Sequence, residues 1–230
     1  MHHARIVAVT QPIESVTGCK TADEFIAYVA RVSNPSNQNN TETAPKLLKY
    51  LAKHKHWSPF EMVTVCMEIE TTRDIARQIL RHRSFSFQEF SQRYADPTKD
   101  LGFERREARL QDNKNRQNSI VLDTVNNLEH RELYKDWEEK QIDVQIAAQK
   151  AYKWAVDNGI AKEQARAVLP EGLTISRMYM TGSVRSWIHY CQLRCGVETQ
   201  QEHREVAYSA WYALTSQFPS LKDALDIGVE

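Results

Sequence analysis

Residues 81–94 hold the side chains best suited to chemistry. This segment, Arg-His-Arg-Ser-Phe-Ser-Phe-Gln-Glu-Phe-Ser-Gln-Arg-Tyr, combines guanidinium groups, hydroxyls and aromatic rings at high density. Guanidinium groups bind phosphates and carboxylates through paired planar hydrogen bonds, and arginine and aromatic side chains also cover flat rings. A large anionic aromatic ligand therefore suits the segment. The alternative is a charged helix end that runs into a loop, although functional side chains concentrate on loops held by rigid elements.

The spacing of these residues resembles the signature of the flavin-dependent thymidylate synthases, in which Arg81-His82-Arg83 is followed after seven residues by Ser91. Further fragments that resemble this family cover most of the chain, at 56–61, 76–83, 89–94, 165–170 and 185–194. The resemblance implies reductive methylation of dUMP to dTMP. It also implies 5,10-methylenetetrahydrofolate as the carbon donor, FAD as the hydride carrier and NADPH as the reductant.

The same resemblance implies a role for individual positions. The catalytic residue would be Arg194, whose charge stabilises negative charge on the uracil ring so that its C5 becomes nucleophilic. Residues implied to contact the flavin are Ser58, Arg81, His82, Arg83, Glu89, Ser183, Val184, Arg185 and His189. Residues implied to hold the nucleotide are Gln78, Arg81, Glu89, Phe90, Ser91, Gln92, Arg93, Arg166 and Arg194. The family's sites lie between subunits of a homotetramer, so the same assembly is expected here.

Two serines have alternative interpretations. Ser183 stands where the family commonly has Asn, and its hydroxyl could serve only as the cap of the following helix. Ser91 could be a nucleophile, but a serine nucleophile needs an adjacent base that the sequence does not place. Contact with a phosphate is the preferred interpretation of Ser91.

Two rival functions are considered. A single-stranded nucleic-acid-binding module could use the arginines of 81–94 for phosphates and its aromatic rings for base stacking. The balance of 30 Lys+Arg against 30 Asp+Glu argues against it, because the chain has no overall positive field. A cysteine-dependent thymidylate synthase would need a nucleophilic Cys beside His, which the surroundings of Cys191 do not offer.

The elements that must position these residues follow an α+β pattern. The hydrophobic periodicity predicts strands at 5–10, 63–70 and 174–181. It predicts helices at 21–32, 46–54, 72–81, 123–157, 162–168, 183–195 and 200–217, with one capped turn at 58–61. We expect a single domain over 1–230, a small β-sheet flanked by several helices, and a mobile loop at 105–118. The helix at 123–157 exceeds the usual length, so a break or cover by another subunit is expected.

The helix at 72–81 should present a cationic ridge. Arg73, Arg77 and Arg81 share one side of it, opposite an apolar side. Continuing the helix to Arg83 would turn that side chain toward the apolar side. Either the helix stops before Arg83, or Arg83 is buried against an anionic partner.

Other residues suggest no separate site. The four cysteines are expected to be reduced thiols in a cytoplasmic protein. Cys191, Cys195 and His189 lack the second matching pair that zinc sites usually show, so no metal is expected. His54, His56 and His203 are expected to be surface residues. No apolar run approaches the ~20 residues that cross a bilayer, so no membrane partner is expected.

Overall fold

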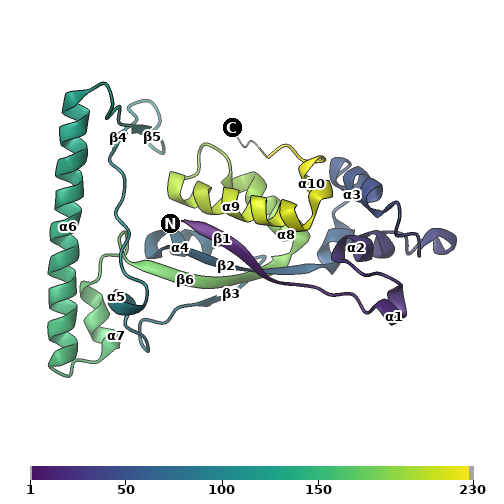
Figure 1. Ribbon diagram of the computed structural model, residues 1–230, viewed down its shortest axis with the longest axis horizontal. Coiled ribbons are helices and arrows are strands. Elements are labelled where there is room, and N and C mark those ends of the chain that lie inside the picture. The colour runs from purple at the N-terminus through teal and green to yellow at the C-terminus, as the bar shows by residue number, and fades with distance from the viewer. Residues whose placement is uncertain (1, 228–230) are drawn as a thin grey trace.

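A four-stranded antiparallel sheet organises the computed structural model, which describes residues 2–227 (Figure 1). Its strand order is β1 (His3–Val9), β2 (Thr64–Thr72), β6 (Ile175–Ser183) and β3 (Ser86–Glu89). Strands β1, β2 and β6 confirm the three predicted strands, because every end lies within two residues of its predicted position. Strand β3 was not predicted, although the alternating sequence Ser-Phe-Ser-Phe before Gln88 is a strand pattern.

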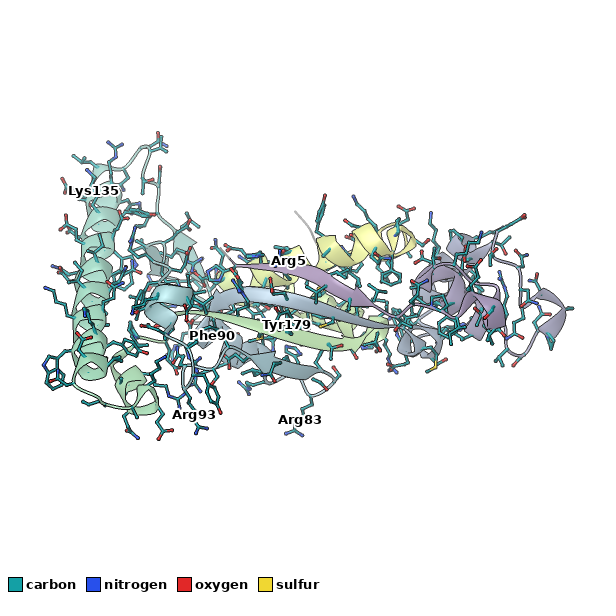
Figure 2. The ribbon with its side chains drawn as sticks, turned by 60° about the horizontal axis from the view of Figure 1, so that its bottom comes forward. Arg5, Arg83, Phe90, Arg93, Lys135 and Tyr179 are labelled. Atoms are coloured by element: carbon teal, nitrogen blue, oxygen red, sulfur yellow. The ribbon has the colours of Figure 1, made fainter. Side chains whose placement is uncertain are left out.

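The register separates an apolar face of the sheet from a polar one. One cross-strand row consists of Ile6, Met67, Met180 and Phe87, and Met67 and Met180 are fully buried. The adjacent row consists of Arg5, Glu68, Tyr179 and Gln88. On that second face Arg5 Nε and the Tyr179 hydroxyl each donate to the Glu68 carboxylate at 2.8 Å (Figure 2). The period-two pattern read from the sequence therefore matches the two faces.

Helices cover the apolar face. Those in contact with it are α4 (Arg73–Ile79), α8 (Val184–Arg194) and α9 (Gln201–Gln217). At one end the core continues into α2 (Ala22–Ala30), α3 (Ala44–Lys53), the turn η2 (Ser58–Met62) and α10 (Pro219–Lys222). The predicted capping box of α2 is confirmed, since Thr21 and Glu24 exchange side-chain to backbone hydrogen bonds. Shorter elements are α1 (Glu14–Thr17), η1 (Pro35–Asn37), α5 (Pro97–Asp100), α7 (Lys162–Ala165) and η3 (Arg166–Val168).

The long helix α6 (Leu128–Asp157) stands beside the sheet at the left of Figure 1. It is continuous over 30 residues, which rules out a break, the first of the two alternatives expected for its length. It begins later than predicted because the Asp123 carboxylate accepts from the amides of Val125 and Asn126 and forms a turn instead. Trp137 and Trp154 on α6 are 43% and 63% exposed. Cover by another subunit stays a prediction.

The segment predicted as a loop at 105–118 contains a strand of a small hairpin. Strands β4 (Arg109–Gln111) and β5 (Ser119–Val121) pair antiparallel. The Asp112 carboxylate accepts from the amides of Lys114 and Asn115 and shapes the turn between them. Each strand has only three residues, too few for a periodic pattern to be visible in the sequence.

A buried carboxylate anchors this hairpin segment to the helices. Glu202, in the first turn of α9, forms ion pairs with Arg106 at 2.9 Å and with Arg109. Arg106 also bonds to both oxygens of Asp74, at 2.7 and 2.9 Å. Although burial raises the pKa of Glu202, the charges of Arg106 and Arg109 lower it to about 2.

We therefore predict an acid-dependent contribution from Glu202. A carboxyl whose pKa falls on folding stabilises the fold above its ordinary value of 4.5, and this stabilisation is lost as the pH falls toward 2. Glu202→Gln should lower the free energy of unfolding at pH 7 by about 3 kcal/mol, since it leaves both guanidinium groups without a carboxylate. The difference in free energy of unfolding between Glu202→Gln and the unmodified protein should shrink as the pH falls from 4.5 to 2. Urea titrations at each pH measure it. The matched control is the exposed Glu205→Gln, and an unchanging gap for Glu202→Gln would contradict the assignment.

A close approach of Phe85 to Gly182 fixes the start of the segment 81–94. Phe85 is almost fully buried, and its ring lies 4.9 Å from that of Trp187 and 6.1 Å from that of Tyr190. A Cβ at Gly182 would stand 2.5 Å from Phe85 Cδ1. Glycine is therefore required here by space, and it allows the ring to rest on β6.

Gly182→Ala should force Phe85 out of its position. We expect a loss of about 1–3 kcal/mol, as for other overpacked cores, and a fall in Tm of several degrees. The matched control is Gly172→Ala, because a Cβ there meets nothing within 4 Å. Thermal unfolding of both variants measures the difference. Equal Tm values for the two would show that Phe85 does not depend on this contact.

Candidate functional site

The predicted site residues fall into three groups within one chain. The central group consists of Gln78, His82 and Arg194, at the ends of α4 and α8. The loop group consists of Ser91, Arg93 and Arg166, after β3 and beside α7. The helix-start group consists of Ser58, Ser183, Arg185 and His189, where η2 meets the beginning of α8.

The central group brings His82 and Arg194 into direct contact. Arg194 Nε donates to His82 Nε2 at 3.0 Å, and the His82 ring lies edge-on to Tyr190 with centroids 5.0 Å apart. Burial, with the nearby charge of Arg194, lowers the pKa of His82 to about 4. His82 is therefore neutral near pH 7 and accepts a hydrogen bond at Nε2. Helix α4 ends at Ile79, before Arg83, whose exposed side chain extends away from the chain in Figure 2.

His203 belongs beside this group, which the sequence analysis missed. The prediction of a surface position is wrong, because His203 is fully buried. Its Nδ1 lies 3.2 Å from Gln78 Oε1. The available signal was its place one residue after Glu202 on the buried side of α9, a place that periodicity alone does not distinguish from a structural histidine. His54 and His56, by contrast, are exposed as predicted.

The two arginines of the loop group both contact Glu163. Arg93 Nε lies 3.3 Å from Glu163 Oε2, and Arg166 Nε donates to the Glu163 backbone carbonyl at 3.3 Å. Lys162 Nζ donates to the carbonyl of Tyr94 at 2.8 Å and holds α7 against the loop. The Arg93 side chain is 58% exposed, so an incoming anion could compete with Glu163 for it.

Three predicted site residues from the end of β3 to Gln92 differ in which of their polar groups already have a hydrogen-bond partner. Glu89 Oε1 accepts from Ser176 Oγ at 2.7 Å and from Arg73 Nη1 at 3.4 Å. The amide of Phe90 donates to the Arg177 carbonyl at 2.8 Å, so this N–H is not available to a ligand. Gln92 is 4% exposed, and its Nε2 has no hydrogen-bond partner among the described residues. A buried amide without a partner is costly, so a ligand acceptor would stabilise it.

The helix-start group depends on Glu61, a second residue that the sequence analysis missed as a contact. Ser183 Oγ donates to Glu61 Oε2 at 2.6 Å, and Arg185 Nη1 donates to Glu61 Oε1 at 2.7 Å. These two hydrogen bonds and the charge of Arg185 lower the pKa of Glu61, although burial opposes them. Ser183 also caps α8, accepting from the amide of Ser186, as the alternative interpretation expected.

Two other residues of this region are placed differently. The exposed His189 lies edge-on to Trp57, with ring centroids 5.3 Å apart. The side chain of Val184 is fully buried and its amide donates to the Val63 carbonyl at 2.8 Å, so neither is free for a ligand within one chain. Partial burial of the His189 ring is the main cause of its lowered pKa, and the charge of Arg185 adds to it.

The cationic ridge of α4 is partly neutralised. Arg73 pairs with Glu89 and Arg77 with Glu171, while Arg81 is exposed beyond the helix end. Arginines that already have carboxylate partners contribute less attraction for a polyanion. This arrangement weakens the case for a nucleic-acid surface.

The cysteines form no metal site. All four are free, and burial raises the pKa of Cys191 and Cys195. Among residues 2–227, no cluster of three or more His, Cys, Asp or Glu side chains could hold a metal ion. Within the same part of the chain, no helix has the length and apolar character to cross a membrane.

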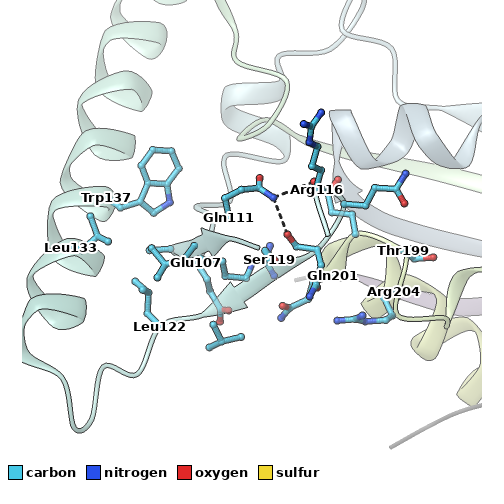
Figure 3. A pocket seen from close by; sticks show the side chains of 17 residues that line it. Glu107, Gln111, Arg116, Ser119, Leu122, Leu133, Trp137, Thr199, Gln201 and Arg204 are labelled. Atoms are coloured by element: carbon cyan, nitrogen blue, oxygen red, sulfur yellow. Dashed lines mark hydrogen bonds between the residues drawn. The ribbon is translucent and has the colours of Figure 1, made fainter. Parts of the chain in front are cut away.

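A pocket of about 630 Å³ lies between the β4–β5 hairpin, α6 and the start of α9 (Figure 3). Trp137 and Leu133 line its apolar side, and Arg116 and Arg204 its polar side. None of the predicted site residues lines it. Gln200 links the pocket with them, since this lining residue accepts a hydrogen bond from Gln78 at 2.9 Å.

Known proteins resemble this chain over nearly its whole length. The family model described as thymidylate synthase complementing protein matches residues 15–220. A probable flavin-dependent thymidylate synthase of Paramecium bursaria Chlorella virus 1 is 47% identical over 97% of this chain and 98% of its own. A flavin-dependent thymidylate synthase of Synechocystis sp. is 47% identical over 96% of this chain and 98% of its own.

A solved structure has the same fold. The UMP/dUMP methylase PolB from Streptomyces cacaoi, bound with 5-Br dUMP, superposes with a TM-score of 0.75, covering 97% of this chain and 94% of that one at 24% identity. The comparisons give no support to a nucleic-acid-binding module. By its family match and its full-length identity to these relatives, the chain belongs to the flavin-dependent thymidylate synthase family, and is thus an enzyme of the methyltransferase class.

Proposed function

We propose that residues 1–230 form one domain that methylates dUMP to dTMP, with 5,10-methylenetetrahydrofolate as carbon donor, FAD as hydride carrier and NADPH as reductant. The observation that carries the proposal is the contact between Arg194 and the neutral His82, beside Gln78. In this contact a permanent positive charge stands next to an uncharged imidazole. Such a pair suits a site where negative charge develops on a neutral ring.

The chain offers donors that fit a flavin dinucleotide. Arg81, Arg83 and Arg185 provide guanidinium groups for its pyrophosphate, and Ser58 lies exposed at the start of η2. The rings of His189 and Trp57 lie together at the surface that Arg185 borders. When bound, the flavin supplies the hydride that completes the new methyl group.

Arg194 provides the electrostatic part of the reaction. Its guanidinium stabilises negative charge on the pyrimidine, so C5 gains nucleophilic character without a covalent bond to the protein. His82 takes one of its N–H groups and fixes the orientation of the guanidinium plane. The buried Cys191 and Cys195, whose thiol pKa values are raised, take no part as nucleophiles.

The loop group holds the nucleotide phosphate. Ser91, Arg93 and Arg166 supply a hydroxyl and two guanidinium groups, and the phosphate replaces Glu163 as the partner of Arg93. The buried Gln92 amide gains an acceptor from the same ligand. The phosphate carries up to two negative charges against one on Glu163, and the guanidinium groups of Arg93 and Arg166 together match it.

The three groups are proposed to meet in a homotetramer with sites between subunits. In one chain they occupy separate ends of α4, α7 and α8, each with its own hydrogen bonds. Exposed apolar side chains on α6, including Trp154 and Ile146, provide surface for a second copy. Assembly covers that surface and brings residues of different protomers to one ligand.

The colour of the protein and the behaviour of Arg194→Ala test the proposed function. The purified protein should be yellow and should bleach when NADPH is added without oxygen. Arg194→Ala should keep the flavin and lose at least a hundredfold in dTMP formation, as expected when one electrostatic stabiliser is removed. Absorbance and a dTMP assay measure the two properties.

A matched control removes an arginine that is not among the predicted site residues. Arg204→Ala takes away a guanidinium of α9 that donates to the Val197 carbonyl at 3.3 Å, and it should retain full turnover. A colourless protein, or unchanged turnover in Arg194→Ala, would refute the proposal.

Mixing two inactive variants tests the shared site. Arg194→Ala and Arg166→Ala should each be inactive alone, and their co-expression should restore part of the activity, because some sites then receive both native arginines from different protomers. Light scattering should give about four times the chain mass of 26.7 kDa. No recovery in mixed assemblies would place both arginines of each site on one chain.

A further inference from the structure

A chain of hydrogen bonds runs through the central group from Tyr190 to Glu202. The Tyr190 hydroxyl lies 3.1 Å from His203 Nε2, and His203 Nδ1 lies 3.2 Å from Gln78 Oε1. Gln78 Nε2 donates to Gln200 Oε1 at 2.9 Å, and Gln200 Nε2 donates to Glu202 Oε2 at 2.9 Å. These contacts join α8, α4 and the start of α9.

The carboxylate at one end fixes the direction of every bond in the chain. Glu202 is ionised between Arg106 and Arg109 and therefore only accepts. Gln200 must turn its N–H toward Glu202 and its oxygen toward Gln78. Gln78 must then donate through Nε2, which leaves Oε1 to face the histidine. Reversing either amide would set two donors or two acceptors against each other.

His203 completes the chain as a neutral imidazole. Burial, with the nearby charge of Arg194, lowers the pKa of His203 to about 3. A neutral ring has one N–H, and the Gln78 oxygen requires it at Nδ1. Nε2 is then the acceptor for the Tyr190 hydroxyl.

We propose that His203 is a positioning residue that, together with Gln200, locks the Gln78 amide in one of its two orientations, so that the site selects a uracil over a cytosine ring. The selection rests on the proposed function. The locked amide keeps one N–H and one oxygen lone pair for a ligand. In the proposed site the free N–H faces position 4 of the pyrimidine, where uracil presents an acceptor and cytosine a donor, so only uracil is matched while the amide cannot flip.

Two substitutions at His203 separate its hydrogen bond from its volume. His203→Leu removes the N–H that faces Gln78, whereas His203→Asn can return an amide N–H near the place of Nδ1. Flavin-loaded protein is titrated with dUMP and dCMP. His203→Leu should weaken dUMP binding about tenfold and narrow the preference for dUMP over dCMP, with kcat at saturating dUMP little changed. His203→Asn should recover most of the dUMP affinity and most of the preference for dUMP over dCMP.

The exposed His54→Asn is the matched control and should change neither affinity. Thermal unfolding confirms that each His203 variant is folded. A folded His203→Leu with the original preference for dUMP would overturn the proposed selection. If both His203 variants are unfolded, Tyr190→Phe takes their place, since it removes the donor to Nε2 and should narrow the same preference.

The tautomer of His203 tests the chain of hydrogen bonds without any ligand. NMR of protein with isotopically labelled histidine should show His203 protonated at Nδ1 and bare at Nε2, with His203→Asn identifying its signal. A proton on Nε2 would contradict the proposed direction of the hydrogen bonds in this chain. Failure of the unmodified protein to bind flavin or dUMP would instead refute the proposed function and the selection with it, and would leave the tautomer result standing.

Discussion

The antiparallel pairing of β6 with both β2 and β3 is the constraint on which the rest of the structure depends. It brings the residues that follow β2 and the residues that precede β3 to the same strand, and β6 itself leads directly into α8. Helices α4 and α8 therefore start from neighbouring strands and end near each other, with His82 and Arg194 in contact. Gly182 makes this possible, since only hydrogen at that position lets Phe85 rest on the strand.

Charge is distributed in this protein by pairing. Three of the six arginines predicted for the candidate site have a carboxylate or an imidazole beside them, since Arg93 has Glu163, Arg185 has Glu61 and Arg194 has His82. The zero net charge of the sequence agrees with this local compensation. At Arg93 and Arg185 an anionic ligand must therefore compete with a carboxylate for the guanidinium group.

One buried carboxylate has two consequences. Glu202 ties Arg106 and Arg109 to α9, which places the β4–β5 hairpin segment against the helices. The same group gives the hydrogen-bond chain through Gln200 and Gln78 a single direction. A stabilising ion pair thus also determines the orientation of an amide in the central group, because a carboxylate near neutral pH has no proton to donate.

By itself the sequence determined the strands β1, β2 and β6, the main helices and the family, because periodicity, capping residues and motif spacing are local properties. It also determined which residue types the site contains. The tertiary structure alone decided that the alternating residues before Glu89 pair with β6, that β4 and β5 form a hairpin, and that α6 runs unbroken, because each depends on contacts or lengths that a short local pattern does not specify. It also decided the roles of Glu61 and His203. Each becomes visible only when its partner, Arg185 or Gln78, arrives from more than a hundred residues away in the chain.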